Sequence, residues 1–218
     1  LKAVYDAHPQ FVSMTIGLHP EEIGDDYHEQ LQAMHQMLAE GTMPFVAVGE
    51  IGIDLYWEQD KRDEQIEALD TQLRWCKEFD LPFIIHCRDG VAECLEVMDN
   101  FGEPLPKGVF HSFTGTPADI EAIRKRGDFY FGVNGIVTFK KSEVKANLPV
   151  IGLDRLLLET DAPYLAPVPK RGKRTVPTQQ QFIITYSNEK NNCIFSTAHF
   201  CPCGFRTAIA TKHHATQA

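Results

Sequence analysis

Short apolar runs alternate with amphipathic stretches from the start of the chain to about residue 174. The runs are nearly continuous and rich in β-branched and aromatic residues, which is typical of strands covered on both faces. They predict six strands: Phe11–Leu18, Phe45–Ile51, Phe83–Cys87, Val109–His111, Phe129–Val133 and Leu156–Glu159. The alternation of such strands with helical stretches indicates an α/β fold with a parallel sheet.

The stretches between the strands show helical periodicity. Apolar residues recur every three or four positions, so each helix has one apolar face. These faces are formed by Tyr27, Leu31, Met34 and Leu38 in one helix and by Ile66, Leu69, Leu73 and Cys76 in a longer one. A third helix is predicted to begin at Thr116, where a hydroxyl N-cap precedes Pro117 and the acidic Asp119.

Six strands are fewer than the eight of a closed parallel barrel. The sequence therefore predicts either an open sheet or a barrel that lacks two strands. Residues 1–174 form one predicted domain. From residue 175 to residue 218 charged residues are sparse, and neither helical nor strand periodicity persists. This tail is not assigned a place in the barrel.

Charge and composition limit the classes of partner. The chain of 218 residues carries a formal net charge of −9, which disfavours broad attraction to DNA or anionic membranes. Bound metal ions would reverse the local sign within a cluster of carboxylates. No apolar run approaches the roughly 20 residues that span a bilayer, and the six cysteines are irregularly spaced. We expect a cytoplasmic monomer with free thiols and no membrane partner.

Four predicted strands lead into side chains that bind metal ions. They lead into Glu50, His86, His111 and the Glu159-Thr160-Asp161 segment. The carboxyl ends of parallel barrel strands share one face, so these residues are expected to converge. Imidazole and carboxylate ligands suit zinc, manganese, magnesium or iron and can activate a water molecule. Any one of these residues has a structural alternative as a hydrogen-bonded or turn residue, but four together predict a metal site.

Several short motifs in fixed order resemble those of one family. They are Gly17-Leu18-His19-Pro20, Gly49-Glu50-Ile51-Gly52-Ile53-Asp54, Ile85-His86-Cys87-Arg88, His111-Ser112-Phe113-Thr114-Gly115, Leu158-Glu159-Thr160-Asp161-Ala162-Pro163-Tyr164-Leu165 and Arg171-Gly172-Lys173-Arg174. The order and spacing over residues 1–174 resemble the TatD family, whose members are metal-dependent deoxyribonucleases on a TIM-barrel scaffold. The resemblance implies an incomplete TIM barrel with about six of its eight strands.

The resemblance also implies a two-metal centre. Glu50 is similar to the carboxylate that bridges the two ions, and His86 and His111 to the histidines that complete the second site. Asp161 is similar to a ligand of the first ion that takes a proton from the attacking water. The catalytic residues implied are thus Asp161 and Glu50. Magnesium, manganese and zinc are not distinguished.

Further positions resemble residues around the centre. His19 and Arg88 are similar to residues near the substrate phosphate, and Asp54 and Glu159 to acidic residues that orient the ligands. Arg171 and Lys173 belong to a basic cluster that either neutralises a phosphate or is a solvated loop. Four aromatic residues can stack on bases or pack in the core, and the sequence leaves this open: Tyr56, Trp57, Phe113 and Tyr164.

The chain departs from the family pattern at both ends. The family's first His-x-His pair has no counterpart, and Thr175-Val176-Pro177 replaces an expected Asn-Glu-Pro. We interpret the chain as an N-terminally truncated member with an atypical tail, the product of a frameshift or a mis-joined end. A first metal site without these histidines is expected to bind weakly and to support slow hydrolysis.

The function that these residues predict is metal-dependent cleavage of DNA phosphodiester bonds. The expected substrate is single-stranded DNA or DNA ends. Two alternatives remain at this stage. One is a metal-dependent esterase or deacylase, for example one that acts on D-aminoacyl-tRNA. The other is an inactive fragment that only binds metal.

Overall fold

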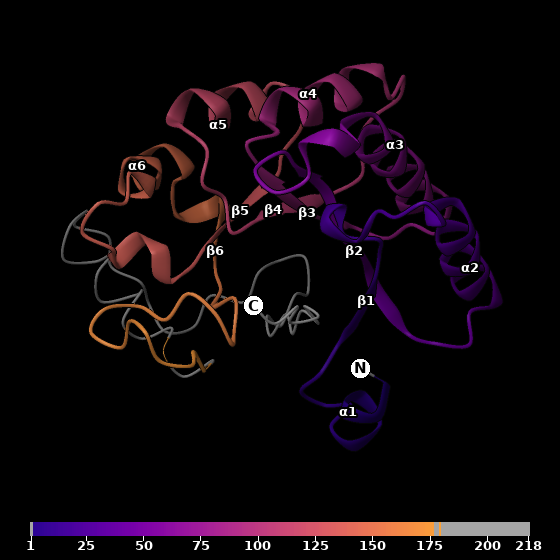
Figure 1. The fold of residues 1–218 in the computed structure, drawn as a ribbon, viewed down its shortest axis with the longest axis horizontal. Coiled ribbons are helices and arrows are strands. Elements are labelled where there is room, and N and C mark those ends of the chain that lie inside the picture. Colours follow the sequence, from indigo (N-terminus) through magenta and orange to yellow (C-terminus); the bar gives the residue numbers. More distant parts are fainter. Residues whose placement is uncertain (1, 177–178, 180–218) are drawn as a thin grey trace.

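The computed structural model describes residues 2–176 and residue 179. Six parallel strands form one sheet in the order of the chain, β1-β2-β3-β4-β5-β6 (Figure 1). The strands are β1 (Met14–Ile16), β2 (Phe45–Asp54), β3 (Phe83–Arg88), β4 (Gly108–His111), β5 (Tyr130–Val133) and β6 (Leu156–Leu158). The predicted α/β fold with six parallel strands is therefore confirmed.

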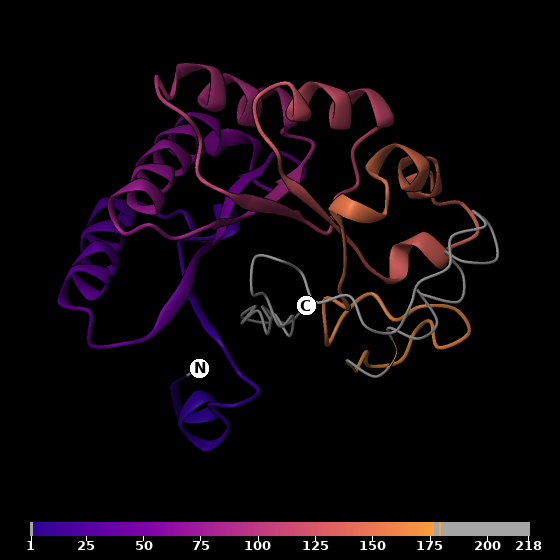
Figure 2. The same ribbon diagram turned by 180° about the vertical axis from the view of Figure 1, so that it is seen from behind.

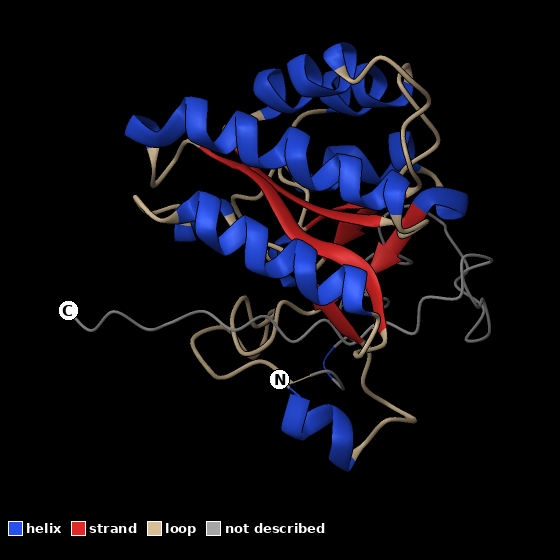
Figure 3. Ribbon diagram, turned by 90° about the vertical axis from the view of Figure 1, so that its right-hand side faces the viewer, coloured by secondary structure: helices blue, strands red, loops and turns tan. Residues whose placement is uncertain are grey.

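Helices form a layer along one face of this sheet (Figures 1 and 2). The helices of this layer are α2 (Tyr27–Glu40), α3 (Arg62–Glu78), α4 (Val91–Asn100), α5 (Pro117–Arg124) and α6 (Asn147–Ile151), whereas α1 (Lys2–Ala7) lies apart from them near the N-terminus. Figure 3, turned by a right angle, shows helices in front of the twisted strands. None of the helices in the described part of the chain is long and apolar enough to cross a bilayer.

The predicted apolar helix faces point into the core. Tyr27, Leu31 and Leu38 of α2 are buried, as are Leu69, Leu73 and Cys76 of α3. Helix α5 begins as predicted, because the Thr116 side chain and Asp119 form a reciprocal capping box ahead of Pro117.

The first strand is shorter than predicted. Residues 11–13 precede β1, and the side chain of Phe11 is 70% exposed. The backbone N–H groups of Phe11 and Val12 donate to the carbonyl of His8 instead of to a neighbouring strand. A turn after α1 thus uses the hydrogen bonds that a longer β1 would need.

Alternation along the strands separates two faces of the sheet. The face under the helices carries the main core, to which Val48, Phe83, Phe110 and Phe131 belong. The opposite face carries a small apolar layer of Ala47, Ile84 and Val109, against which Tyr130 and Leu157 pack. Within the described residues β1 and β6 do not pair with each other, so the barrel is not closed.

The division at residue 174 stays a prediction. Of the predicted tail, residues 175–218, the structure describes only Thr175, Val176 and Gln179, and the rest lies outside the described residues.

Candidate metal centre

A β-bulge in β2 determines where Glu50 points. Gly49 pairs with Ile84 and Ile51 pairs with Ile85, so Glu50 is the extra residue between two neighbouring pairs. Val48 and Ile51 both pack in the helix-covered core, although they are three residues apart. The bulge therefore turns Glu50 away from that core and towards the opposite face of the sheet, the inner face, which also carries Ile84 and Val109.

Gly52 is required beside this bulge. Its φ of +141° is rare for residues with a side chain, and a Cβ there would lie 1.9 Å from the carbonyl oxygen of His86. At the other glycine of the Gly-Glu-Ile-Gly motif, Gly49, a Cβ would lie 2.6 Å from the Cβ of Ile84, so both glycines beside the carboxylate are needed for close packing against β3.

His111, at the end of β4, lies among three carboxylates. Its Nδ1 is 2.7 Å from Oε2 of Glu159, whose other oxygen accepts a hydrogen bond from the backbone N–H of Ser112. The opposite ring nitrogen, Nε2, lies 3.4 Å from Oδ1 of Asp161 and 3.8 Å from Oε1 of Glu50. Glu159 thus orients the ring so that Nε2 faces the other two carboxylates.

Gly132 on β5 leaves room for Glu159. A Cβ at this position would lie 2.4 Å from Oε1 of that carboxylate. Any larger residue would displace Glu159 from its contact with His111.

His86, on β3, has a carboxylate partner of its own. Its Nε2 is 2.8 Å from Oδ2 of Asp54, a residue with no exposed surface at the end of β2. His86 and His111 are register partners on adjacent strands. Two neighbouring histidines are therefore each held through one ring nitrogen by a different acid.

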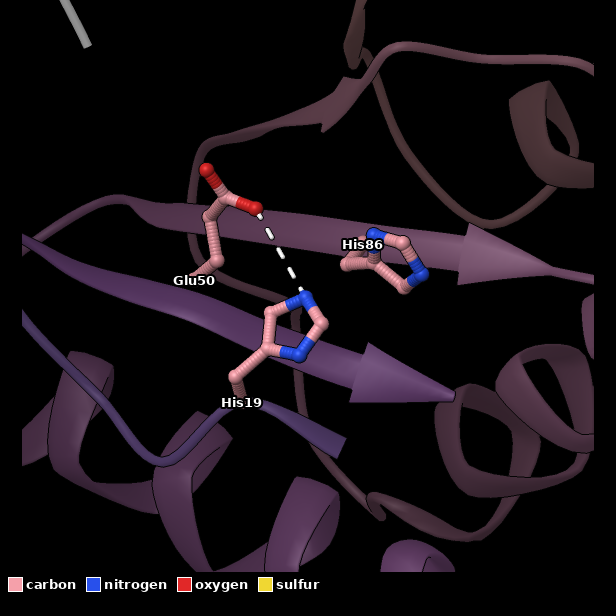
Figure 4. Close-up of side chains that lie close together, drawn as sticks. All are labelled: His19, Glu50 and His86. Carbon is pink, nitrogen blue, oxygen red and sulfur yellow. Dashed lines mark ion pairs between the residues drawn. The ribbon is translucent and has the colours of Figure 1, made fainter. Parts of the chain in front are cut away.

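His19 completes a second group around Glu50. Its ring centroid lies 4.5 Å from that of His86, and its Nε2 lies 3.8 Å from Oε2 of Glu50 (Figure 4). His19 follows β1 through the segment Gly17-Leu18. His19 thus adds a fifth strand end to the cluster. The sequence predicted it as a substrate-binding residue and not as a metal ligand. An apolar strand followed by a histidine was the signal that could have placed it among the ligands.

The electrostatics of the cluster are those of a desolvated charged site. Burial raises the pKa of Glu50, and the neighbouring His111 and His86 oppose that shift. Burial alone would lower the pKa of His111, but Glu159 and Glu50 outweigh it and raise the pKa well above the usual value. Burial would raise the pKa of Asp54, but hydrogen bonds from His86 and from backbone N–H groups hold it low. The carboxylates of Glu50 and Asp161, which both lie close to Nε2 of His111, favour a cation between them.

The donor set fits a divalent metal ion. His19, Glu50 and His86 each offer a ligand atom, and these atoms lie within 4.8 Å of one another; Glu21, Asp54 and His86 form a second such group. Glu50 Oε1 is buried and makes no hydrogen bond within the described residues. A buried carboxylate oxygen without a donor is a costly arrangement that a bound cation would relieve. Glu21 is a residue that the sequence analysis did not single out.

The residues expected to bind substrate are not all at the centre. Arg88 ends β3 two residues after His86, on the same face of the strand. Arg171 and Lys173 are exposed, and the guanidinium of Arg171 lies 4.4 Å from the ring centroid of Phe139. Among the described contacts, neither Arg171 nor Lys173 touches a residue of the metal cluster.

The open question about the aromatic residues is partly answered by burial. Phe113 is 2% exposed and packs in the core. Tyr56, Trp57 and Tyr164 are exposed.

A parallel α/β sheet that gathers histidines and carboxylates at the carboxyl ends of its strands has the arrangement of a TIM-type barrel, here with six strands and not closed within the described residues. The TatD related DNase family model matches residues 1–193, a range that continues past residue 174. The chain belongs to this family.

Relatives of known sequence and structure agree. The chain is 35% identical over 174 residues to the metal-dependent hydrolase YabD of Bacillus subtilis, covering 79% of this chain and 67% of YabD. It is 41% identical over 155 residues to the 3'-5' ssDNA/RNA exonuclease TatD of Cronobacter sakazakii, covering 70% of this chain and 58% of that protein. The chain therefore spans only part of the length of these relatives.

The structure of YjjV, a TatD homologue from Escherichia coli K12, superposes with a TM-score of 0.71 at 31% identity, over 86% of this chain and 73% of that one. A TatD-family hydrolase from Entamoeba histolytica has a TM-score of 0.68 at 23% identity over 86% of this chain and 72% of its own, a likeness of fold.

Proposed function

We propose that this chain carries the catalytic centre of a metal-dependent hydrolase that cleaves phosphodiester bonds of DNA, with single strands or strand ends as substrate. One observation carries the proposal: side chains from separate strand ends meet around Glu50, with His111 Nε2 facing both Glu50 and Asp161. The names of relatives as metal-dependent hydrolase and as ssDNA/RNA exonuclease support it.

Glu50, His86, His111 and Asp161 are proposed to hold the metal. Glu50 is central, since its two oxygens face different histidines, His111 and His19. Together with these histidines, Glu50 would hold a divalent ion; the TatD family pattern has two ions, but the chain lacks the His-x-His pair of the first site, so we expect weak binding of one ion. Magnesium and manganese suit the carboxylates, and zinc suits the imidazoles. A bound divalent ion polarises a phosphodiester and lowers the pKa of a water molecule.

The remaining chemistry belongs to the protein's own side chains. Asp161 is proposed to accept the proton of the attacking water at its carboxylate, with Glu50 as the second catalytic residue. Asp54 and Glu159 fix the ring orientations of His86 and His111. Arg88 is proposed to bind the substrate phosphate, and Arg171 and Lys173 to meet the strand farther from the centre.

The test compares substrates and metals on the same protein. Purified chain is incubated with Mn²⁺, Mg²⁺ or Zn²⁺ and with end-labelled single-stranded DNA, the matching duplex, and an acyl ester. Metal content is measured by plasma mass spectrometry. We expect weakly bound metal, and slow hydrolysis of single-stranded DNA that Glu50→Ala abolishes and that Phe11→Ala, at an exposed site before β1, leaves unchanged.

Other outcomes identify the alternatives. Hydrolysis of the acyl ester without DNA cleavage would make the chain an esterase. Bound metal without any hydrolysis would make it a metal-binding protein.

A further inference from the structure

Two large aromatic side chains lie next to each other on the surface just after β2. Tyr56 is 49% exposed and Trp57 is 61% exposed. Their ring centroids are 4.7 Å apart, with the ring planes nearly perpendicular at 88°. Core packing therefore does not explain them, and adjacent exposed aromatic rings are a feature of surfaces that bind ligands.

Arg88 lies against these rings. Its guanidinium carbon is 3.8 Å from the centroid of the Tyr56 ring and 5.5 Å from that of Trp57. Four other arginines pair with carboxylates: Arg62, Arg74, Arg126 and Arg155. Among the described residues, no carboxylate pairs with Arg88. Its planar set of donors is thus held in place by stacking and left to bind an anion such as phosphate.

Asp54 connects this surface to the metal centre. Its Oδ1 accepts hydrogen bonds from the backbone N–H groups of Tyr56 and Trp57, at 3.0 and 2.9 Å. Its Oδ2 lies 2.8 Å from Nε2 of His86. One buried carboxylate thus positions both a proposed ligand of the metal and the loop that carries the aromatic rings.

The distances along the strands suit a single bound nucleotide. Arg88 is the register partner of Asp54 on the adjacent strand, about 4.8 Å away. It also lies two residues beyond His86, which is about 7 Å along β3. An anion bound by Arg88 would therefore be next to the cluster, while its attached base would reach the rings.

Resting on the function proposed above, we infer that Tyr56, Trp57 and Arg88 form a nucleotide platform on which an unpaired base of the nucleic-acid substrate stacks while Arg88 binds its phosphate. Every base has a π face, so such a platform tolerates any sequence. It requires an unpaired base, because bases in a duplex are stacked on their own neighbours. The platform therefore selects single strands over duplexes and nucleic acids over acyl esters.

The test measures binding in EDTA, where hydrolysis does not interfere. The sequence has two tryptophans, Trp57 and the buried Trp75. A Trp75→Phe variant therefore keeps Trp57 as its one tryptophan, and its fluorescence reports on the platform. We expect oligothymidylate to quench its fluorescence, and an abasic oligonucleotide of equal length and charge not to do so. Trp57→Ala should weaken oligothymidylate binding by about 10-fold, a typical loss for one stacked base. Trp57→Phe should retain most of the affinity.

Two further variants separate the parts of the platform. Arg88→Gln should weaken the binding of both oligonucleotides, since it removes a phosphate contact, whereas Phe11→Ala should change neither. Equal affinity for the abasic and the base-containing strand, or parental affinity in Trp57→Ala, would overturn the platform.

The outcome is independent of the proposed chemistry. If base-dependent quenching occurs but the chain cleaves no DNA with any metal, the platform stands and the hydrolase proposal fails. If DNA is cleaved but Trp57→Ala binds and cleaves like the parent, the hydrolase proposal stands and the platform fails.

Discussion

Two histidines that are register partners on β3 and β4 are each paired with a carboxylate, and the pairs differ in what else each acid holds. Glu159 binds His111 and the backbone N–H of Ser112, and both side chains of this pair are almost fully buried. Asp54 binds His86, whose side chain is 18% exposed, and also the backbone of the aromatic loop after β2.

The difference shows two uses of the same contact. In the buried pair the acid serves only to orient a ring and to satisfy a backbone donor. In the other pair, whose histidine is partly exposed, the acid also holds the backbone of a surface loop next to the cluster. We therefore expect substitutions in the two pairs to have similar effects on metal binding and different effects on nucleic-acid binding.

The largest effect should come from Glu50, which faces both pairs. Glu50→Ala removes a carboxylate that lies 3.8 Å from both His19 and His111. Substituting a residue that only supports a ligand typically costs 10- to 100-fold in metal affinity, so loss of this group should cost more than about 100-fold. Isothermal titration with Mn²⁺ measures it, with the isosteric Glu50→Gln as the matched variant. Unchanged metal stoichiometry in both would remove Glu50 from the centre.

The next effect should come from the buried pair. Glu159→Ala leaves the ring of His111 without its acid and the N–H of Ser112 without an acceptor. We expect metal affinity to fall by about 10- to 100-fold and the free energy of unfolding to fall by about 1–3 kcal/mol. Metal titration and chemical denaturation measure the two losses. Oligothymidylate binding in EDTA should not change, and a clear loss there would contradict the separation of the pairs.

Asp54 offers a sharper version of the comparison. Asp54→Ala should lower metal affinity by about 10- to 100-fold and also weaken oligothymidylate binding in EDTA, because the loop loses its acceptor. Asp54→Asn retains an oxygen for the N–H groups of Tyr56 and Trp57 while it loses the charge beside His86. It should therefore weaken metal binding and preserve oligonucleotide binding. Identical behaviour of the two variants in both assays would show that Asp54 does not link loop and ligand.

The smallest effect should come from a substitution outside both pairs. Thr116→Ala removes the N-cap of α5 and should lower the free energy of unfolding by about 1 kcal/mol. Metal and oligonucleotide affinities should remain at parental values. Thermal denaturation measures the loss, and any fall in metal affinity here would show that reduced stability alone accounts for part of the effects above.

Much of the fold could be read from local patterns. The apolar faces of α2 and α3, the N-cap of α5 and the positions of the later strands all follow from residue spacing within one element. The proposed ligands on β2, β3 and β4 were identified in the same way, although β2 runs to Asp54 and not only to the predicted Ile51, and β3 runs to Arg88 and not only to Cys87. The start of β1 was not, because Phe11 reads as a strand residue until the turn after α1 takes its hydrogen bond.

The site was less accessible to the sequence. Strict alternation would place Glu50 on the same face as Val48, and only the bulge opposite Ile84 and Ile85 turns it inward. The inclusion of His19 and Glu21 near His86 depends on how strands lie side by side, which no spacing along one segment records.

Taken alone, the order of residues determined which elements form and which chemical groups stand at their ends, because helix and strand periods are local properties. Tertiary structure decided which ring nitrogen meets which acid, which aromatic residues face water and which basic residues lie near the cluster. Those relations join residues far apart in the chain, and they arise only when neighbouring strands fix a common register.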